Sequence, residues 1–159
     1  MATSTYTQVL NSLNINNQSN FGEQFLSTEA EKMKYLGEEI NKDGIMTDYS
    51  ILSIVPVTKW FLGRAKMVQD TTDREILEKI NPLILDSAYY MGESFVRSTR
   101  SLSWRTDIKD NILPKVTGFK FNICMCPLSD TYEMFEDILI NRKSLEEVER
   151  TILMWLIKV

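Results

Sequence analysis

Histidine is absent from the sequence, cysteine occurs only twice, and no long uninterrupted apolar run is present. Without histidine, a catalytic site would lack the usual general base near neutral pH and the Ser-His and Cys-His nucleophile pairs. A structural zinc site takes four cysteine or histidine ligands, and Cys124 and Cys126 have no second pair to join them. We therefore predict a protein that is not an enzyme and that holds neither a metal nor a cofactor.

Glycine is also scarce, and it does not gather into a loop. The six glycines form neither a G-x-G-x-x-G pattern nor a loop ending in Lys-Ser or Lys-Thr, so no cradle for nucleotide phosphates is expected. A net charge of -4 gives no basic surface from which a bound nucleic acid could release counterions. The sequence therefore argues against nucleotides and nucleic acids as ligands.

The most apolar window, residues 51–63, is too short to span a bilayer and contains Pro56 and Lys59. Residues 1–20 are polar and asparagine-rich, without the basic start and apolar run of a signal peptide. They are expected to form a mobile arm, or a first helix over "YTQVLNSL". Since the two thiols are expected to stay reduced, these features predict a cytoplasmic protein that does not bind membranes.

A chain of 159 residues with 43% apolar and 25% charged residues can bury a core of its own, so we predict one globular domain over residues 1–159. Helix starts are marked where a capping side chain stands three residues before a glutamate. Such places occur at "TEAE", "TDRE", "DTYE" and "SLEE", which begin at Thr28, Thr72, Asp130 and Ser144.

The predicted helices run over about 29–41, 74–80 and 83–99, and from 131 to the C-terminus with a break at 141–143. Gly44 is expected to end the first helix in a left-handed conformation. Pro56 is expected to end or kink the element that contains it, whereas Pro82 suits the first turn of a helix. In the last helix, apolar residues recur at three- and four-residue steps and predict a docked face: Leu145, Val148, Ile152, Trp155 and Val159.

After Arg100 the pattern becomes typical of strands. The runs "SLSWRTD" and "KVTGFKFNICM" are rich in β-branched and aromatic residues, and in the second run Phe119 and Phe121 are expected to share one face. Cys124 and Cys126 are expected to be structural residues on a buried strand. The sequence as a whole predicts an α+β fold: a mostly helical single domain with a small antiparallel strand pair near residues 102–126.

The step Tyr-x-Gly-Glu occurs twice, in "KYLGEEI" and in "AYYMGES". Because glycine costs about 1 kcal/mol relative to alanine inside a helix, two such glycines indicate a steric reason. We predict that Gly37 and Gly92 let two helices pack closely, while the glutamates face solvent or pair with a neighbouring arginine. The alternative is an enzyme or small-ligand binder whose pocket holds Glu38 and Glu93 as a carboxylate pair.

A protein partner is the function that we predict first. Tryptophan and arginine are enriched at the centres of interfaces, and Trp104 and Arg105 stand together, followed by Asp107 and Asp110. These four residues are the predicted contacts with another protein. A further alternative is a homo-oligomer, with the C-terminal "ILMWLIKV" forming a self-complementary surface.

The arrangement "AYYMGESFVR…SLSW…ILPKVTGF…CPL", within residues 88–128, resembles a pattern in small uncharacterised bacterial proteins, some of them similar to immunity proteins of polymorphic toxin systems. This resemblance implies a compact bacterial protein of the cytoplasm. It also implies a function as an inhibitor that neutralises a toxin by covering it.

Overall fold

The computed structural model of the protein describes residues 20–68, 80–107 and 113–159. The elements in chain order are α2 (Phe21–Lys42), α3 (Ile51–Met67), α5 (Asn81–Ser98), β1 (Ser103–Arg105), β2 (Lys115–Thr117), the 3-10 helix η1 (Lys120–Asn122), α6 (Pro127–Leu139) and α7 (Glu146–Leu156). Helices thus dominate, and the strands form one antiparallel pair. The predicted α+β fold, mostly helical with a small strand pair, is confirmed.

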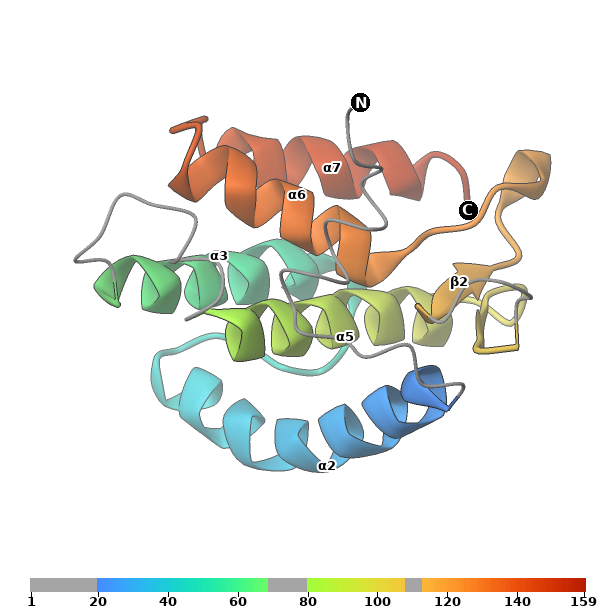
Figure 1. Cartoon of the computed structure of the whole chain (residues 1–159), viewed down its shortest axis with the longest axis horizontal. Helices are drawn as coiled ribbons and strands as arrows, with labels where there is room; N and C mark the ends of the chain where they lie inside the picture. The colour runs from blue at the N-terminus through green and yellow to red at the C-terminus, as the bar shows by residue number, and fades with distance from the viewer. Residues whose placement is uncertain (1–19, 69–79, 108–112) are drawn as a thin grey trace.

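Helix α5 lies at the centre of the molecule. It contacts α2, α3, α6 and both strands, and Figure 1 shows α2 on one side of the α3–α5 layer and α6 and α7 on the other. Every residue from Asp86 to Gly92 is buried, so this stretch of the helix presents no face to solvent. A helix that is buried all round belongs to the core.

The helix starts follow the sequence signals only in part. Helix α2 begins at Phe21, so Thr28 lies inside it, and α6 begins at Pro127 rather than at residue 131. Ser144 does act near a helix start, since its Oγ accepts a hydrogen bond from the Glu146 N–H at 3.2 Å. Pro82 lies in the first turn of α5 as predicted. The "TDRE" signal and the predicted mobile arm fall outside the described residues.

Helix α3 runs through Pro56, so of the two predicted effects of this proline, an end or a kink, the end does not occur. The ring removes one N–H donor, whose acceptor in an unbroken helix would be the carbonyl of Leu52. Because Leu52 and Pro56 are both exposed, water can replace the missing hydrogen bond. On the opposite side of the helix, Val57 and Phe61 are fully buried and dock it against its neighbours.

The strand pair is shorter than the sequence pattern predicts. Trp104 pairs with Val116, and Val116 also exchanges two backbone hydrogen bonds with Met125, at 2.8 and 2.9 Å. Between these pairings Gly118 has φ 109°, and an added Cβ would overlap the carbonyl oxygen of Ser101. The alternation therefore stops at Gly118, where only glycine fits.

Two predictions in this region are wrong for that reason. Phe119 is buried whereas Phe121, in η1 with φ 65°, is exposed, so the two rings do not share a face. Cys124 is exposed and Cys126 is half-buried, so the expected buried strand with two structural cysteines does not form. The last helix is docked as predicted through Val148, Ile152 and Trp155, whereas Leu145 is exposed and Val159 is only half-buried. Among the described helices, none combines the length and apolarity needed to cross a membrane.

Candidate functional site

Gly92 makes room for the indole of Trp104. A Cβ added at Gly92 would overlap two indole carbons and would lie 2.9 Å from Cγ of Pro127. The indole is also nearly parallel to the ring of Tyr89, with an interplanar angle of 5° and centroids 6.4 Å apart. Its Nε1–H donates to Oε2 of Glu93 at 2.9 Å. Trp104 is therefore half-buried and fixed by contacts within the protein.

Glu93 joins this tryptophan to an arginine. Its second oxygen, Oε1, accepts a hydrogen bond from Nε of Arg97 at 3.0 Å. Cζ of Arg97 lies 3.8 Å from the ring centroid of Tyr49, a cation–π contact. The pairing of Glu93 with an arginine agrees with the structural interpretation of the Gly-Glu step.

Tyr49, in the loop between α2 and α3, has a strained backbone. Its φ is 59°, a conformation that is uncommon for a bulky residue and costs on the order of 1–3 kcal/mol. Its N–H donates to the hydroxyl of Tyr90 at 3.1 Å, and the two rings stack with centroids 4.8 Å apart. The Tyr90 hydroxyl in turn lies 2.7 Å from Oγ of Ser53. Helix α5 thus holds Tyr49 in place beneath Arg97.

Beside Arg97, α2, the following loop and α5 enclose a cleft of about 380 Å³. Its lining residues are Ala30, Met33, Lys34, Gly37, Glu38, Asn41, Thr47, Tyr49, Tyr89 and Arg97. Burial and the nearby Glu93 raise the pKa of Tyr89, so this phenol stays neutral. One wall therefore presents a neutral phenol and a guanidinium held by Glu93 and Tyr49, and the other wall is the face of α2 that carries Gly37 and Glu38.

The two glycines do not pack against each other. A Cβ on Gly37 would meet only Thr47, with Oγ1 at 3.2 Å, whereas Gly92 faces Trp104 and Pro127. The predicted close approach of two helices at these glycines is therefore wrong. Each glycine instead accommodates a side chain that follows it in the sequence.

The two glutamates of the predicted carboxylate pair occupy different environments. Glu38 is exposed and lines the cleft. Glu93 is absent from the lining, and its oxygens accept hydrogen bonds from Arg97 and Trp104. Arg97, a predicted partner of the glutamates, connects Glu93 to the cleft together with Tyr49, which the sequence did not single out.

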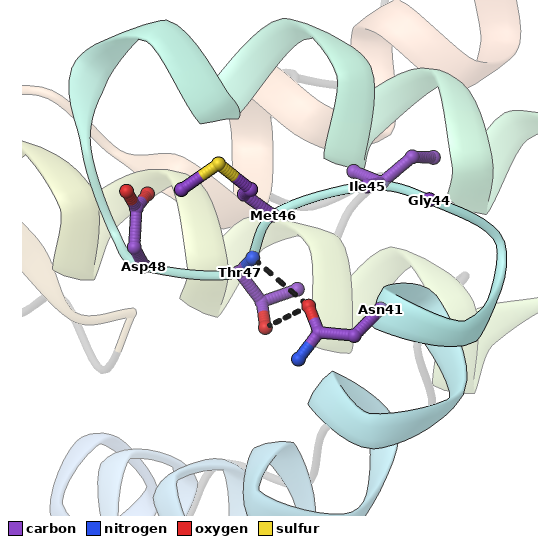
Figure 2. A pocket seen from close by; sticks show the side chains of 6 residues that line it. All are labelled: Asn41, Gly44, Ile45, Met46, Thr47 and Asp48. Atoms are coloured by element: carbon purple, nitrogen blue, oxygen red, sulfur yellow. Dashed lines mark hydrogen bonds between the residues drawn. The ribbon is translucent and has the colours of Figure 1, made fainter.

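A second hollow of about 440 Å³ lies at the turn after α2 (Figure 2), lined by Asn41, Gly44, Ile45, Met46, Thr47 and Asp48. The backbone N–H and the hydroxyl of Thr47 both donate to Oδ1 of Asn41, at 3.2 and 2.9 Å. Gly44, with φ 82°, follows the helix end in the left-handed conformation, as predicted. Because Asn41 and Thr47 line both hollows, their contact stands between this hollow and the cleft.

A different pair of acids is buried between α2 and α5. Glu29 and Asp86 are 4% and 2% exposed, and Nζ of Lys32 lies 2.9 Å from Oδ1 of Asp86. Burial, followed by a hydrogen bond with Asp86, raises the pKa of Glu29 to about 9, so Glu29 carries a proton at neutral pH. The sequence signal was a glutamate four residues from both Phe25 and Met33, on the apolar face of α2.

The largest exposed apolar side chains of the C-terminal half lie near the end of α7. Phe121, Ile157 and Leu153 are 84%, 68% and 60% exposed, and Met154 is also exposed. The N–H of Lys120 donates to the carbonyl of Lys158 at 2.7 Å, which holds η1 against this end of the helix. We call Phe121, Leu153, Met154 and Ile157 the C-terminal apolar surface.

The predicted protein contacts lie on and after β1. Arg105 and Asp107 are exposed and pair with each other, with Nε 2.8 Å from Oδ1. Trp104 is partly exposed but engaged with Glu93, and Asp110 lies outside the described residues. The structure places Trp104 and Glu93 in direct contact, although the sequence assigned them to competing functions.

Comparison with protein-family models, curated proteins and solved structures finds no match. Within the described part of the chain, no group of three or more cysteine, aspartate or glutamate residues is arranged to hold a metal ion.

Proposed function

We propose that the protein acts by binding another protein through the C-terminal apolar surface. The observation that supports this proposal is the exposure of Phe121 in η1 and of Leu153 and Ile157 near the end of α7, two segments joined by the backbone hydrogen bond between Lys120 and Lys158. Large apolar side chains that are exposed on adjoining segments favour an interaction site, because a partner would remove their surface from water. Aromatic and methionine side chains are enriched at the centres of such contacts.

The proposed anchor is Phe121 rather than Trp104. The indole of Trp104 already packs on Gly92 and donates to Glu93, so a partner would gain little from it. The side chain of Phe121 is exposed in a turn where Phe121 and Asn122 both adopt the left-handed backbone conformation, with φ 65° and 53°. Strained backbone that holds an apolar side chain in solvent favours a binding role for that side chain. Arg105, at the end of β1, and Asp107, which follows it, remain proposed polar contacts.

The resemblance of the sequence to immunity proteins supports a toxin as the partner class. Under this proposal the protein would inhibit the toxin by covering its surface, without chemistry of its own. A gene for a secreted toxin beside the gene for this protein would agree with the proposal, and a metabolic operon would count against it.

Two single variants and one control test the contact. Wild type, Phe121→Ser, Ile157→Ser and Tyr35→Ser would be used in affinity capture, and the captured protein would then be purified and titrated against each. Tyr35 is a matched control, because it is 69% exposed but lies on α2, on the far side of the molecule (Figure 1). We expect the first two variants to weaken binding about tenfold or more, or roughly 1.4 kcal/mol. Equal affinity for all four proteins would contradict the proposal.

The second candidate is a homo-oligomer formed through the same surface. It is favoured by the exposure of Leu153, Met154 and Ile157 within the predicted self-complementary segment. Sedimentation over a concentration series separates the two candidates. A dimer that Ile157→Ser dissociates would support self-association, and a monomer at every concentration would support a different protein as the partner.

A further inference from the structure

We infer that the cleft between α2 and α5 binds a small zwitterion with an apolar body, the chemistry of a free amino acid with an apolar side chain. This cleft and the C-terminal apolar surface share no residue. The inference therefore stands or fails independently of the proposed protein contact.

The first support is the fixed orientation of Arg97. Its Nε is held by Glu93 at 3.0 Å and its Cζ by the face of Tyr49 at 3.8 Å. Within the described ranges Nη1 and Nη2 make no hydrogen bond, and the side chain lines the cleft. A planar guanidinium that is already immobilised loses little entropy when it receives a carboxylate through two parallel hydrogen bonds.

The second support is the backbone strain at Tyr49, the residue that holds Arg97 in place. Tyr49 carries a left-handed backbone that is unusual for a tyrosine, and the stacking on Tyr90 and the hydrogen bond from its N–H maintain it. This contact places the ring under Arg97. Strain that the surrounding structure holds in place is concentrated at ligand sites, because it pre-organises the groups that bind.

The third support is the opposite wall. Gly37 lies against Thr47. Next to it, Glu38 lines the cleft and makes no ion pair in the described part of the chain. The neighbouring Lys34 is already paired with Glu31 at 2.9 Å. A ligand with only a carboxylate would meet Arg97 and also the like charge of Glu38, whereas a zwitterion complements both charges.

The apolar side chain of the ligand would pack against the apolar part of the cleft lining. Met33, Ala30, Gly37 and the ring of Tyr89 line the cleft, and a volume of about 380 Å³ is near the lower end for small-molecule sites. The site therefore fits a molecule as small as leucine, methionine or phenylalanine better than an extended ligand.

Calorimetric titration of the full chain with these three amino acids at millimolar concentration tests the inference. N-acetyl-phenylalanine, which lacks the ammonium group, and phenylalaninamide, which lacks the carboxylate, serve as matched probes. Wild type is expected to bind at least one of the free amino acids. It should bind N-acetyl-phenylalanine more weakly and should show no measurable binding of phenylalaninamide. Absence of binding by all three amino acids would overturn the inference, as would equal binding of the amide.

Two variants test which side chain binds the carboxylate of the ligand and which binds its ammonium group. Arg97→Lys keeps the charge but removes the fork, and should weaken carboxylate binding about tenfold or more, as expected for a charged hydrogen bond. Glu38→Gln should abolish the preference for phenylalanine over its acetylated form. Since Glu38 is exposed, this variant should fold even if Arg97→Lys does not. Arg105→Gln, outside the cleft, is the control. Unchanged selectivity in Glu38→Gln would refute the proposed ammonium contact.

Discussion

At the scale of single residues, the space around Gly92 is already filled. The indole of Trp104 lies where a β-carbon would be, and Pro127 closes the other side. Gly63, in α3, is the opposite case, since an added Cβ would have no atom within 4 Å. Both are glycines within helices, so they differ mainly in their surroundings.

This contrast predicts opposite effects of one methyl group. Gly92→Ala should lower the free energy of unfolding by about 1–3 kcal/mol, because Trp104 must move and its hydrogen bond to Glu93 is disturbed. Gly63→Ala should raise the free energy of unfolding by about 0.5–1 kcal/mol through helix propensity. Urea unfolding followed by circular dichroism measures both. If the two variants had the same midpoint, the packing at Gly92 would be misassigned.

At the scale of elements, the buried pair Glu29 and Asp86 joins α2 to α5. The protonated Glu29 and the nearby Lys32 together compensate for the burial of Asp86. The pair is therefore a polar contact within an otherwise apolar interface, and its stability depends on whether Glu29 keeps its proton.

The pair predicts a specific pH dependence. The pKa of Glu29 is about 9 in the folded protein against an ordinary value of 4.5, so above pH 4.5 the folded state binds one proton that the unfolded state has lost. The free energy of unfolding contributed by this group therefore falls as pH rises toward 9. Burial and Glu133 raise the pKa of Asp130 to about 7, which adds a slope of the same sign only below pH 7.

Glu29→Gln, neutral at every pH, should remove the fall between pH 7 and 9. Its amide can still donate to Asp86. Glu39→Gln, an exposed change on the same helix, should keep the wild-type slope. Denaturant unfolding at several pH values compares the three proteins, and a wild-type slope in Glu29→Gln would show that Glu29 does not hold this proton.

The elements that sequence reasoning predicted correctly are those with local signals. Pro82 marks the start of α5, and the spacing of Val148, Ile152 and Trp155 marks the buried face of α7. The strand beyond Gly118 was predicted wrongly because its course depends on a distant contact. Gly118 marks the place of the break, but the path that follows it depends on the hydrogen bond from the Lys120 N–H to the carbonyl of Lys158, which is distant in the sequence.

The candidate site could be predicted only in fragments. Trp104, Glu38 and Glu93 were singled out from the sequence, but their relation was not. Arg97 and Tyr49 meet only because α5 and the loop before α3 are packed together. The pairing of Glu93 with an arginine was predicted, but the strained tyrosine beneath that arginine leaves no periodic signal, so the contact between Tyr49 and Arg97 could not be predicted from the sequence.

At the scale of the whole molecule, α5 is in contact with elements on all sides, whereas α2 has a described contact with α5 and a long exposed face. Stability is accordingly uneven: exposed elements with few neighbours can open while the centre stays folded. Both outer layers in Figure 1, α2 on one side and α6 with α7 on the other, pack on the central layer that contains α3 and α5.

Hydrogen exchange should reveal this order. Amides of α5 between Asp86 and Phe95 are expected to exchange only on global unfolding, and those of the first turns of α2 at much lower opening free energy. Mass spectrometry of peptic peptides under increasing denaturant measures both. If α2 were protected as strongly as α5, the molecule would unfold as one unit and the layered order would be wrong.

The turn at η1 has a practical consequence. Its backbone holds the side chain of Phe121 in solvent, so a larger group attached to the ring would not disturb the packing of the protein. A photo-reactive phenylalanine analogue installed at this position would retain the aromatic shape and, on illumination, form a covalent bond to whatever rests there. The turn that ends the predicted strand thus provides a position for photo-crosslinking, which can capture a partner whose complex dissociates too fast to be purified.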